Sequence, residues 1–208
     1  MHTAVYKQGE ENECFREYGV IRGRLGIFSI HGGSIENGTE QIARYLAERT
    51  DCTVYIFSGR ERAGNRRLHI PSNETSWFER PFFKECFSRV EAVVALHGHG
   101  RNDNEVYIGG KNVFLKKKTK EVLEKDLKRH RILTHEVPNE LRGRHPDNFT
   151  NLPVNRGIQI ELPRSLRKAK TTTGWSRHEW SELYGDTLRF ANSLTKAIEN
   201  YLCKPFQE

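Results

Sequence analysis

The sequence has no long apolar run and few cysteines, and each absence excludes a class of protein. No segment reaches the roughly 18 consecutive apolar residues of a membrane-spanning helix, so we expect no membrane partner. The cysteines, at positions 14, 52, 86 and 203, are scattered and form no CxxC pair. This spacing excludes a zinc ribbon and a disulfide framework, and it predicts free thiols in a reducing compartment.

The sequence also lacks a secretory signal, a linker and an internal repeat. The amino-terminal segment MHTAVYKQGEENECF is polar and acidic, without the apolar core that a signal peptide requires. With 208 residues, of which 36% are hydrophobic, the chain is long enough to bury a substantial core. We therefore predict one globular domain over residues 1–208, made in the cytoplasm.

The chain is basic, with a formal net charge of +7. A basic surface attracts polyanions of any kind. Sites for single-stranded nucleic acid combine basic residues with aromatic platforms, whereas Trp77, Trp175 and Trp180 do not cluster with basic runs. The tryptophan positions count against nucleic acid, but the charge alone fits nucleic acid, an acidic polymer and a carboxylate-rich substrate equally well. The lysine run at positions 116–118 is interpreted as a solvated helix face.

Apolar runs alternate with amphipathic segments along the chain. Strands are predicted over residues 25–30, 52–57, 91–96, 105–108, 132–137 and 157–162, with short strands near 18–22 and 67–70. Helices are predicted over residues 39–49, 82–90, 113–131 and 176–202. This alternation predicts an α/β fold, in which helices cover both faces of a mixed, mostly parallel sheet.

The segment LGIFSIHGGSIENGTE, residues 25–40, places two chemical groups in one loop. An apolar strand stops at His31, and Glu36 follows before a predicted helix. Positions five apart face different directions on a helix or a strand, so only a loop lets His31 and Glu36 converge. Loops of this kind lie at the ligand-binding edge of α/β sheets. Each residue also has a plainer interpretation, His31 as a turn residue and Glu36 as a solvated charge at a helix start.

Two further strands end in polar residues. The strand at 91–96 runs into His97-Gly98-His99-Gly100, and the strand at 157–162 contains Glu161. Two histidines and a carboxylate are typical of a catalytic zinc site that leaves one position for water. From the sequence, His99 remains a metal ligand, a donor to a ligand or a turn residue.

A catalytic zinc site also needs a carboxylate that does not bind the metal and accepts the proton of the water. Glu161 fits this role, because a buried, unpaired carboxylate is costly without a purpose. The plainer alternative is that Glu161 pairs with Arg164 or Arg167, which follow the strand.

The segments IHGGSIENGTEQIA, LHI, LHGHG, VYIGG and GIQIELPRSLR occur in this order between residues 27 and 167. Together they resemble the poly-γ-glutamate hydrolase family, whose members occur in bacteriophages of capsule-forming bacilli and in some bacteria. That family is similar in fold to zinc carboxypeptidases. The resemblance therefore implies a three-layer α/β/α sandwich and a single catalytic domain.

The resemblance also implies roles for individual residues. In the wider carboxypeptidase group the first two ligands are spaced His-x-x-Glu, whereas here four residues separate His31 from Glu36. The third ligand is a histidine directly after an apolar strand, which matches His97 and not His99. The general base matches Glu161. The implied cofactor is Zn²⁺ on His31, Glu36 and His97, with Glu161 as the catalytic residue.

The activity implied by the resemblance is hydrolysis of γ-amide bonds within poly-γ-glutamate, by a monomer released on host lysis to act on extracellular capsule. Each unit of that polymer carries a free carboxylate, which arginine binds in a bidentate manner. Candidate substrate-binding residues are Arg66, Arg67, His69, His99, Arg164 and Arg167. His69 has core packing as its alternative.

Two other functions are compatible with the sequence. One is a different metal-dependent, carboxypeptidase-like amidase that acts on acyl-amino acids or peptides. The other is a polyanion-binding module without chemistry. The module needs no metal and no Glu161, which separates it from the enzymes.

Overall fold

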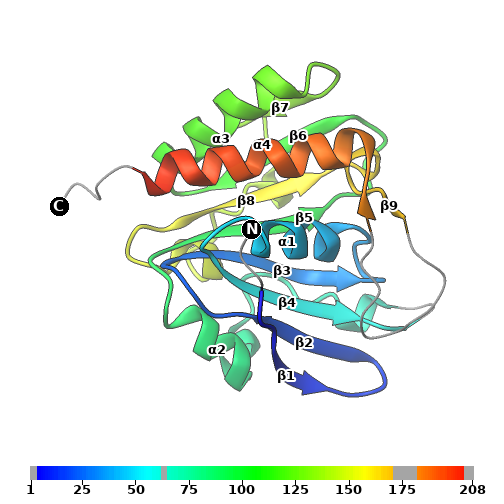
Figure 1. Cartoon of the computed structure of the whole chain (residues 1–208), viewed down its shortest axis with the longest axis vertical. Helices are drawn as coiled ribbons and strands as arrows, with labels where there is room; N and C mark the ends of the chain where they lie inside the picture. The colour runs from blue at the N-terminus through cyan, green and yellow to red at the C-terminus, as the bar shows by residue number, and fades with distance from the viewer. Residues whose placement is uncertain (1–3, 62–64, 171–181, 204–208) are drawn as a thin grey trace.

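Eight strands form one mixed sheet in the computed structural model, which describes residues 4–61, 65–170 and 182–203 (Figure 1). Across the sheet they are β1 (Lys7–Glu11), β2 (Phe15–Val20), β4 (Thr53–Gly59), β3 (Leu25–Gly33), β5 (Ala92–Gly98), β8 (Gly157–Leu162), β6 (Glu105–Gly110) and β7 (Arg131–Leu133). The central strands β4, β3, β5 and β8 are parallel, whereas β2 and β6 run antiparallel to their central neighbours. The mixed, mostly parallel sheet is confirmed.

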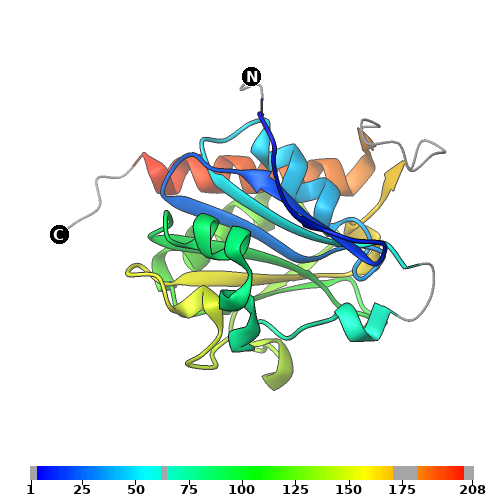
Figure 2. The ribbon, with the colours of Figure 1, turned by 90° about the horizontal axis from the view of Figure 1, so that it is seen from below.

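Helices cover both faces of this sheet, as predicted (Figures 1 and 2). On one face lie α1 (Thr39–Ala47), α3 (Val113–Asp126) and α4 (Gly185–Leu202), and on the other lies α2 (Pro81–Phe87). Alternate residues of a strand face opposite sides, so Ile27 enters the aliphatic core under α1, α3 and α4, and Phe28 enters the aromatic core beside α2. Burial on both faces explains the continuous apolar runs of the central strands.

Some predicted elements differ from the structure. Residues 67–70 form no strand, because the chain closes a 3₁₀ turn, η1 (Asn65–Leu68), before Pro71. The helix predicted to reach residue 131 ends at Asp126, where Leu127 leaves the helical region, and the next strand is confined to β7. The polar edge strand β1 was not predicted.

The final helix starts later than predicted. It begins at Gly185, and residues 182–183 instead form the short strand β10 (Glu182–Leu183), which pairs with β9 (Ala169–Lys170). The predicted residues 176–181 lie outside the described residues. Within the described ranges, no helix has the length and apolar character needed to cross a membrane.

Candidate metal centre

The loop between β3 and α1 brings His31 and Glu36 together. His31 lies near the end of β3, and its carbonyl accepts a hydrogen bond from the backbone N–H of Glu36 (2.8 Å). Gly33 turns the chain at this point with φ +64°, a conformation that side-chain-bearing residues rarely adopt. The loop therefore curls back so that the Glu36 carboxylate meets the His31 ring.

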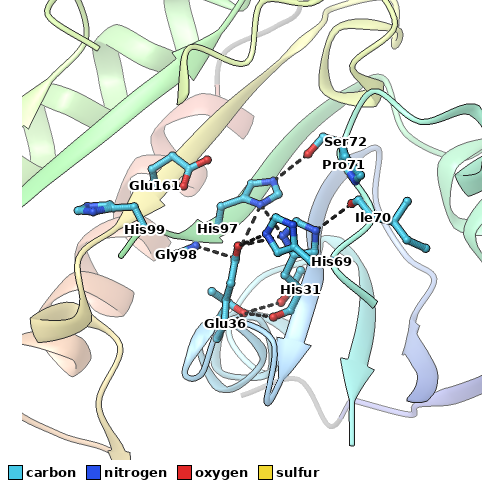
Figure 3. A network of polar contacts seen from close by, with 12 residues as sticks. His31, Glu36, His69, Ile70, Pro71, Ser72, His97, Gly98, His99 and Glu161 are labelled. Carbon is cyan, nitrogen blue, oxygen red and sulfur yellow. Dashed lines mark hydrogen bonds and ion pairs between the residues drawn. The ribbon is translucent and has the colours of Figure 1, made fainter. Parts of the chain in front are cut away.

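His97, at the end of the adjacent parallel strand β5, completes a buried cluster (Figure 3). Nδ1 of His31 lies 3.0 Å from Glu36 Oε1 and 3.1 Å from Nδ1 of His97. The second carboxylate oxygen of Glu36 accepts a hydrogen bond from the backbone N–H of Gly98 (2.7 Å) and lies 3.8 Å from His97 Nδ1. The three side chains named from the sequence thus converge at one point.

The outer nitrogens of both rings have protein partners. Nε2 of His31 lies 2.9 Å from the carbonyl oxygen of Ile70, which can only accept, so this nitrogen donates. Nε2 of His97 lies 3.2 Å from Ser72 Oγ. Metal-binding histidines are usually oriented in this way by a partner on the other ring nitrogen. The arrangement leaves both Nδ1 atoms for the centre of the cluster.

The cluster fits a zinc ion. Two imidazole nitrogens and a carboxylate oxygen are common zinc donors, and at zinc bond lengths of about 2.0–2.1 Å tetrahedral ligand atoms lie roughly 3.3 Å apart. The two Nδ1 atoms lie 3.1 Å apart, and each lies near a carboxylate oxygen of Glu36, His31 at 3.0 Å from Oε1 and His97 at 3.8 Å from Oε2, so the separations are close to that value. Because Nε2 of His31 donates to a carbonyl, Nδ1 of a neutral His31 presents a lone pair to both Glu36 Oε1 and His97 Nδ1, and a shared proton or a cation would satisfy this contact. These residues would leave a further position open to water.

The electrostatics favour the metal-binding forms of the donors. Burial would raise the pKa of Glu36, but His31, His69 and His97 outweigh that effect and hold its pKa well below its usual range. Burial lowers the pKa of His97 to about 3, so its ring is neutral near pH 7. A deprotonated carboxylate and a neutral imidazole are the forms that bind metal.

Glu161 lies beside this cluster, on the strand next to His97. The two residues are paired in register between β5 and β8, and Glu161 is 5% exposed. Its Oε1 accepts a hydrogen bond from Nε2 of Gln159 (2.7 Å). Figure 3 shows its side chain close to His97 and not bonded to the cluster. Glu161 therefore lies near the three candidate metal donors and is not one of that group.

A series of hydrogen bonds through the side-chain amides of Asn148 and Gln159 fixes which end of Gln159 faces Glu161. The backbone N–H of Thr150 can only donate, so its partner at 3.0 Å is the Asn148 oxygen. The Asn148 Nδ2 group then faces Gln159 Oε1 (3.0 Å), which turns the Gln159 Nε2 group toward Glu161. Because Oε1 of Glu161 receives this hydrogen bond, Oε2 is the oxygen free to take a proton.

The cluster and Glu161 line one open cleft of about 650 Å³. Its walls come from the loop after η1, the end of β5 and the segment around residues 139–148. Arg101 and Arg144 lie on these walls, and Arg101 is paired with Asp103 and Glu140. The cleft therefore combines a candidate metal site, the buried carboxyl group of Glu161 and basic residues.

Comparison with known proteins assigns the family. Residues 4–184 match the profile of the family described as poly-gamma-glutamate hydrolase. The chain belongs to this hydrolase family. UPF0714 protein YndL of Bacillus subtilis (strain 168) is 32% identical over 173 residues, which span 79% of this chain and 66% of YndL. The chain spans 67% and 61% of the lengths of two further relatives from that strain.

Solved structures share the hydrolase-family fold. A bacteriophage poly-gamma-glutamate hydrolase superposes with a TM-score of 0.75 at 22% identity, over 93% of this chain and 92% of its own. A zinc-free structure of YndL gives 0.74 at 24% identity, over 92% and 93%. A metallo-carboxypeptidase from Burkholderia cenocepacia gives 0.50 at 9% identity, over 90% and 60%. The carboxypeptidase-like fold predicted from the sequence is confirmed.

The other predicted site residues of this hydrolase-family chain divide into two groups. His69 and His99 line the cleft, and Nε2 of His69 lies 3.1 Å from Glu36 Oε1. His99 is buried, with Nε2 donating to the carbonyl of Glu105 (2.9 Å), and its Nδ1 has no partner among the described residues.

The predicted arginines lie elsewhere. Arg67 is exposed and forms an ion pair with Glu61, and Arg164 is exposed in η5 (Arg164–Leu166). Neither lines the cleft. The side chain of Arg66 lies outside the described residues. Arg167 donates hydrogen bonds to the backbone carbonyls of Leu162 and Asn37, among others, so it links the end of β8 to the loop before α1.

Sequence reasoning missed the residues of the cleft wall. Arg101, Arg144, His145 and Asn148 line the cleft but occupy no recognisable motif, whereas Gln159 lies within the segment GIQIELPRSLR and was assigned no role. Residues 138–155 lie between the predicted strands 132–137 and 157–162, and no helix or strand was predicted there. Gln159 offered one usable signal, because a polar residue two positions before Glu161 shares its strand face.

Ser72 provides a test of the metal site that leaves its donors unchanged. We expect Ser72→Ala to weaken zinc binding by about 10- to 100-fold, because the His97 ring loses the partner that orients it. Competition titration against a chromogenic chelator measures this affinity. Ser88→Ala, at the end of α2 and outside the cleft, is the matched control. Equal affinities for the wild type and both variants would contradict the ligand role of His97.

In the metal-free protein, Glu161 contributes a loss of stability as the pH rises. Burial, with a smaller effect from Glu36, raises the pKa of Glu161 to about 8. The folded state then keeps a proton that the unfolded state releases near its ordinary value of 4.5, so folding weakens between these two pH values.

Glu161→Gln removes that titration. In chelator, its stability relative to the wild type should improve by roughly 3–5 kcal/mol between about pH 4.5 and pH 8.5. Urea unfolding across this range measures the difference. Glu140→Gln, an exposed change on the same cleft wall, is the control for replacing a carboxylate by an amide. If the difference in unfolding free energy between Glu161→Gln and the wild type does not vary with pH, the Glu161 carboxyl group is not desolvated.

Proposed function

We propose that this protein is a zinc-dependent hydrolase that cleaves γ-glutamyl amide bonds within poly-γ-glutamate. The observation that supports this most strongly is the convergence of the His31, Glu36 and His97 donors beside the buried Glu161 in one basic cleft. Family membership supports the polymer as substrate. The proposal also includes the oligomeric state and the place of action: the protein is a monomer that is released on host lysis and acts on extracellular capsule.

Different side chains of the cleft carry out different steps of the proposed hydrolysis. Zn²⁺ held by His31, Glu36 and His97 would lower the pKa of a bound water and polarise the amide carbonyl. Glu161 accepts the proton of the attacking water at Oε2 and returns it to the leaving amine. Gln159 holds Oε1 and so keeps the carboxylate in one orientation.

The basic residues of the cleft suit the polymer. Each γ-linked unit carries a free α-carboxylate, so an extended chain presents a negative charge at regular intervals. Arg144 lies on the cleft wall and has no hydrogen bond or ion pair with the described residues, which leaves its guanidinium group able to bind a substrate carboxylate.

Substrate discrimination tests this function. Zinc-loaded protein is incubated with poly-γ-glutamate, with α-linked polyglutamate and with N-acyl-glutamate, and new amino groups are quantified. We expect amino groups to form only from the γ-linked polymer, and the polymer to shorten before free glutamate accumulates. Cleavage of the acyl-amino acid alone would instead support a small-substrate amidase. Binding of all polyanions without cleavage would support a binding module.

A further inference from the structure

A second hollow lies between α3, the end of β6 and the segment of residues 134–144. It holds about 190 Å³, and its lining includes the basic residues Lys116, His135, Arg142 and Arg144. No carboxylate is among its described lining residues. Arg144 also lines the main cleft, so the two spaces are adjacent. A concave site that is cationic on several sides is complementary to an anion.

Lys116 is the buried charge of this hollow. The sequence interpretation as a solvated residue is wrong for Lys116, which is 9% exposed. Its Nζ donates to the carbonyl of Gly110 (2.7 Å) but forms no ion pair with the part of the chain that the structure describes. An ammonium group has three donors, and burying one without a counter-charge is costly. A bound anion would remove that cost.

The two arginines can add to the same site. Arg142 uses Nε to donate to the carbonyl of Val137 (2.9 Å), which orients its guanidinium group. The backbone at Arg142 approaches the sheet closely because Gly109 has no side chain, since a Cβ there would lie 2.2 Å from the Arg142 carbonyl oxygen. Residue 109 must therefore be glycine for the segment that carries Arg142 and Arg144 to pack against β6.

The hollow also lies at a suitable distance from the proposed chemistry. Gly109 pairs in register with Gln159, two residues before Glu161 on β8, which is about 7 Å along the strand. A γ-linked glutamyl unit adds five backbone bonds, so successive α-carboxylates lie roughly 6 Å apart in an extended chain. Gly109, which lines the hollow, therefore lies about the length of one such unit along the sheet from Glu161.

We propose that Lys116, Arg142 and Arg144 form a carboxylate subsite, which binds the α-carboxylate of a glutamyl unit close to the one being cleaved. This inference rests on the proposed function and deepens it, because it assigns residues to the recognition of the acidic polymer. Lys116 neutralises the carboxylate from the buried side, and the arginines do so from the solvent side.

The test measures binding separately from cleavage. A γ-linked glutamate pentamer is titrated calorimetrically into zinc-loaded Glu161→Gln protein, which should bind without turning over. Adding Lys116→Met should weaken binding by about 10- to 100-fold, the range for losing a charged hydrogen bond. Lys117→Met removes the same charge from an exposed neighbouring position and should leave the affinity unchanged. Arg142→Ala, which lines only the hollow, should weaken binding even if Lys116→Met fails to fold.

The outcomes separate the subsite from the function. Unchanged affinity in both Lys116→Met and Arg142→Ala would overturn the subsite, whereas failure of the parent protein to bind the pentamer would overturn the proposed substrate. Inorganic phosphate serves as a second probe. If phosphate binding depends on Lys116 while pentamer binding does not, the hollow is a phosphate site and the carboxylate assignment is wrong.

Discussion

Glu161→Gln should reduce cleavage of poly-γ-glutamate by about 100- to 10,000-fold while leaving zinc bound, because a general base contributes on this order. The substitution keeps the volume of the side chain and its hydrogen bond from Gln159, which needs only an acceptor oxygen. The introduced amide then presents an NH₂ group where Oε2 would accept a proton. Turnover falls because the water cannot be deprotonated, and the metal donors remain as they were.

Two measurements on the same preparations make this result decisive. Zinc content by elemental analysis should match that of the wild type, and the rate should be compared with that of Glu140→Gln. Glu140 lines the same cleft but is exposed and paired with Arg101, so its loss should change the rate little. Turnover of Glu161→Gln equal to that of Glu140→Gln would contradict the assignment of the base.

His97→Ala should abolish zinc binding and cleavage together. The substitution removes one of three convergent donors, so the loss of affinity should exceed the roughly 10- to 100-fold expected when only an orienting partner is removed. Activity should fall by at least about 1000-fold, since the metal would generate the nucleophile. Zinc content after dialysis and the rate on the polymer measure the two losses.

His145→Ala is the matched control for this variant. His145 lines the same cleft, but it is exposed and lies outside the donor cluster. We expect His145→Ala to retain zinc. A His97→Ala protein that kept one zinc per chain and cleaved normally would place the metal elsewhere.

The sequence was sufficient for the central part of the fold and for the donors that converge there. The strands around His31, His97 and Glu161 are buried on both faces, so their apolar runs are long and end at recognisable polar residues. Parallel neighbours bring those ends to one edge, which made the three residues predictable as a group. The resemblance favoured His97 over His99, and the structure brings His97 into the donor cluster and leaves His99 outside it.

The wall of the site could not be predicted in the same way. Asn148 and Lys116 obtain their environment from contacts with residues far along the chain, and nothing in their local sequence indicates burial. The lysine run was interpreted as solvated, and this holds for Lys117, which is exposed, and in part for Lys118, which is half-buried. Arginines next to motifs were predicted to bind substrate, yet Arg101 and Arg144, which line the cleft, lie in polar segments without a pattern.

The most direct test of the account is the size of purified poly-γ-glutamate on a gel after incubation with the protein, with and without a chelator. We expect rapid shortening of the polymer, its loss in chelator and its recovery when zinc is restored. Shortening that persists after the metal has been removed would contradict a zinc-dependent mechanism. A polymer that stays intact with zinc-loaded protein would contradict the proposed substrate.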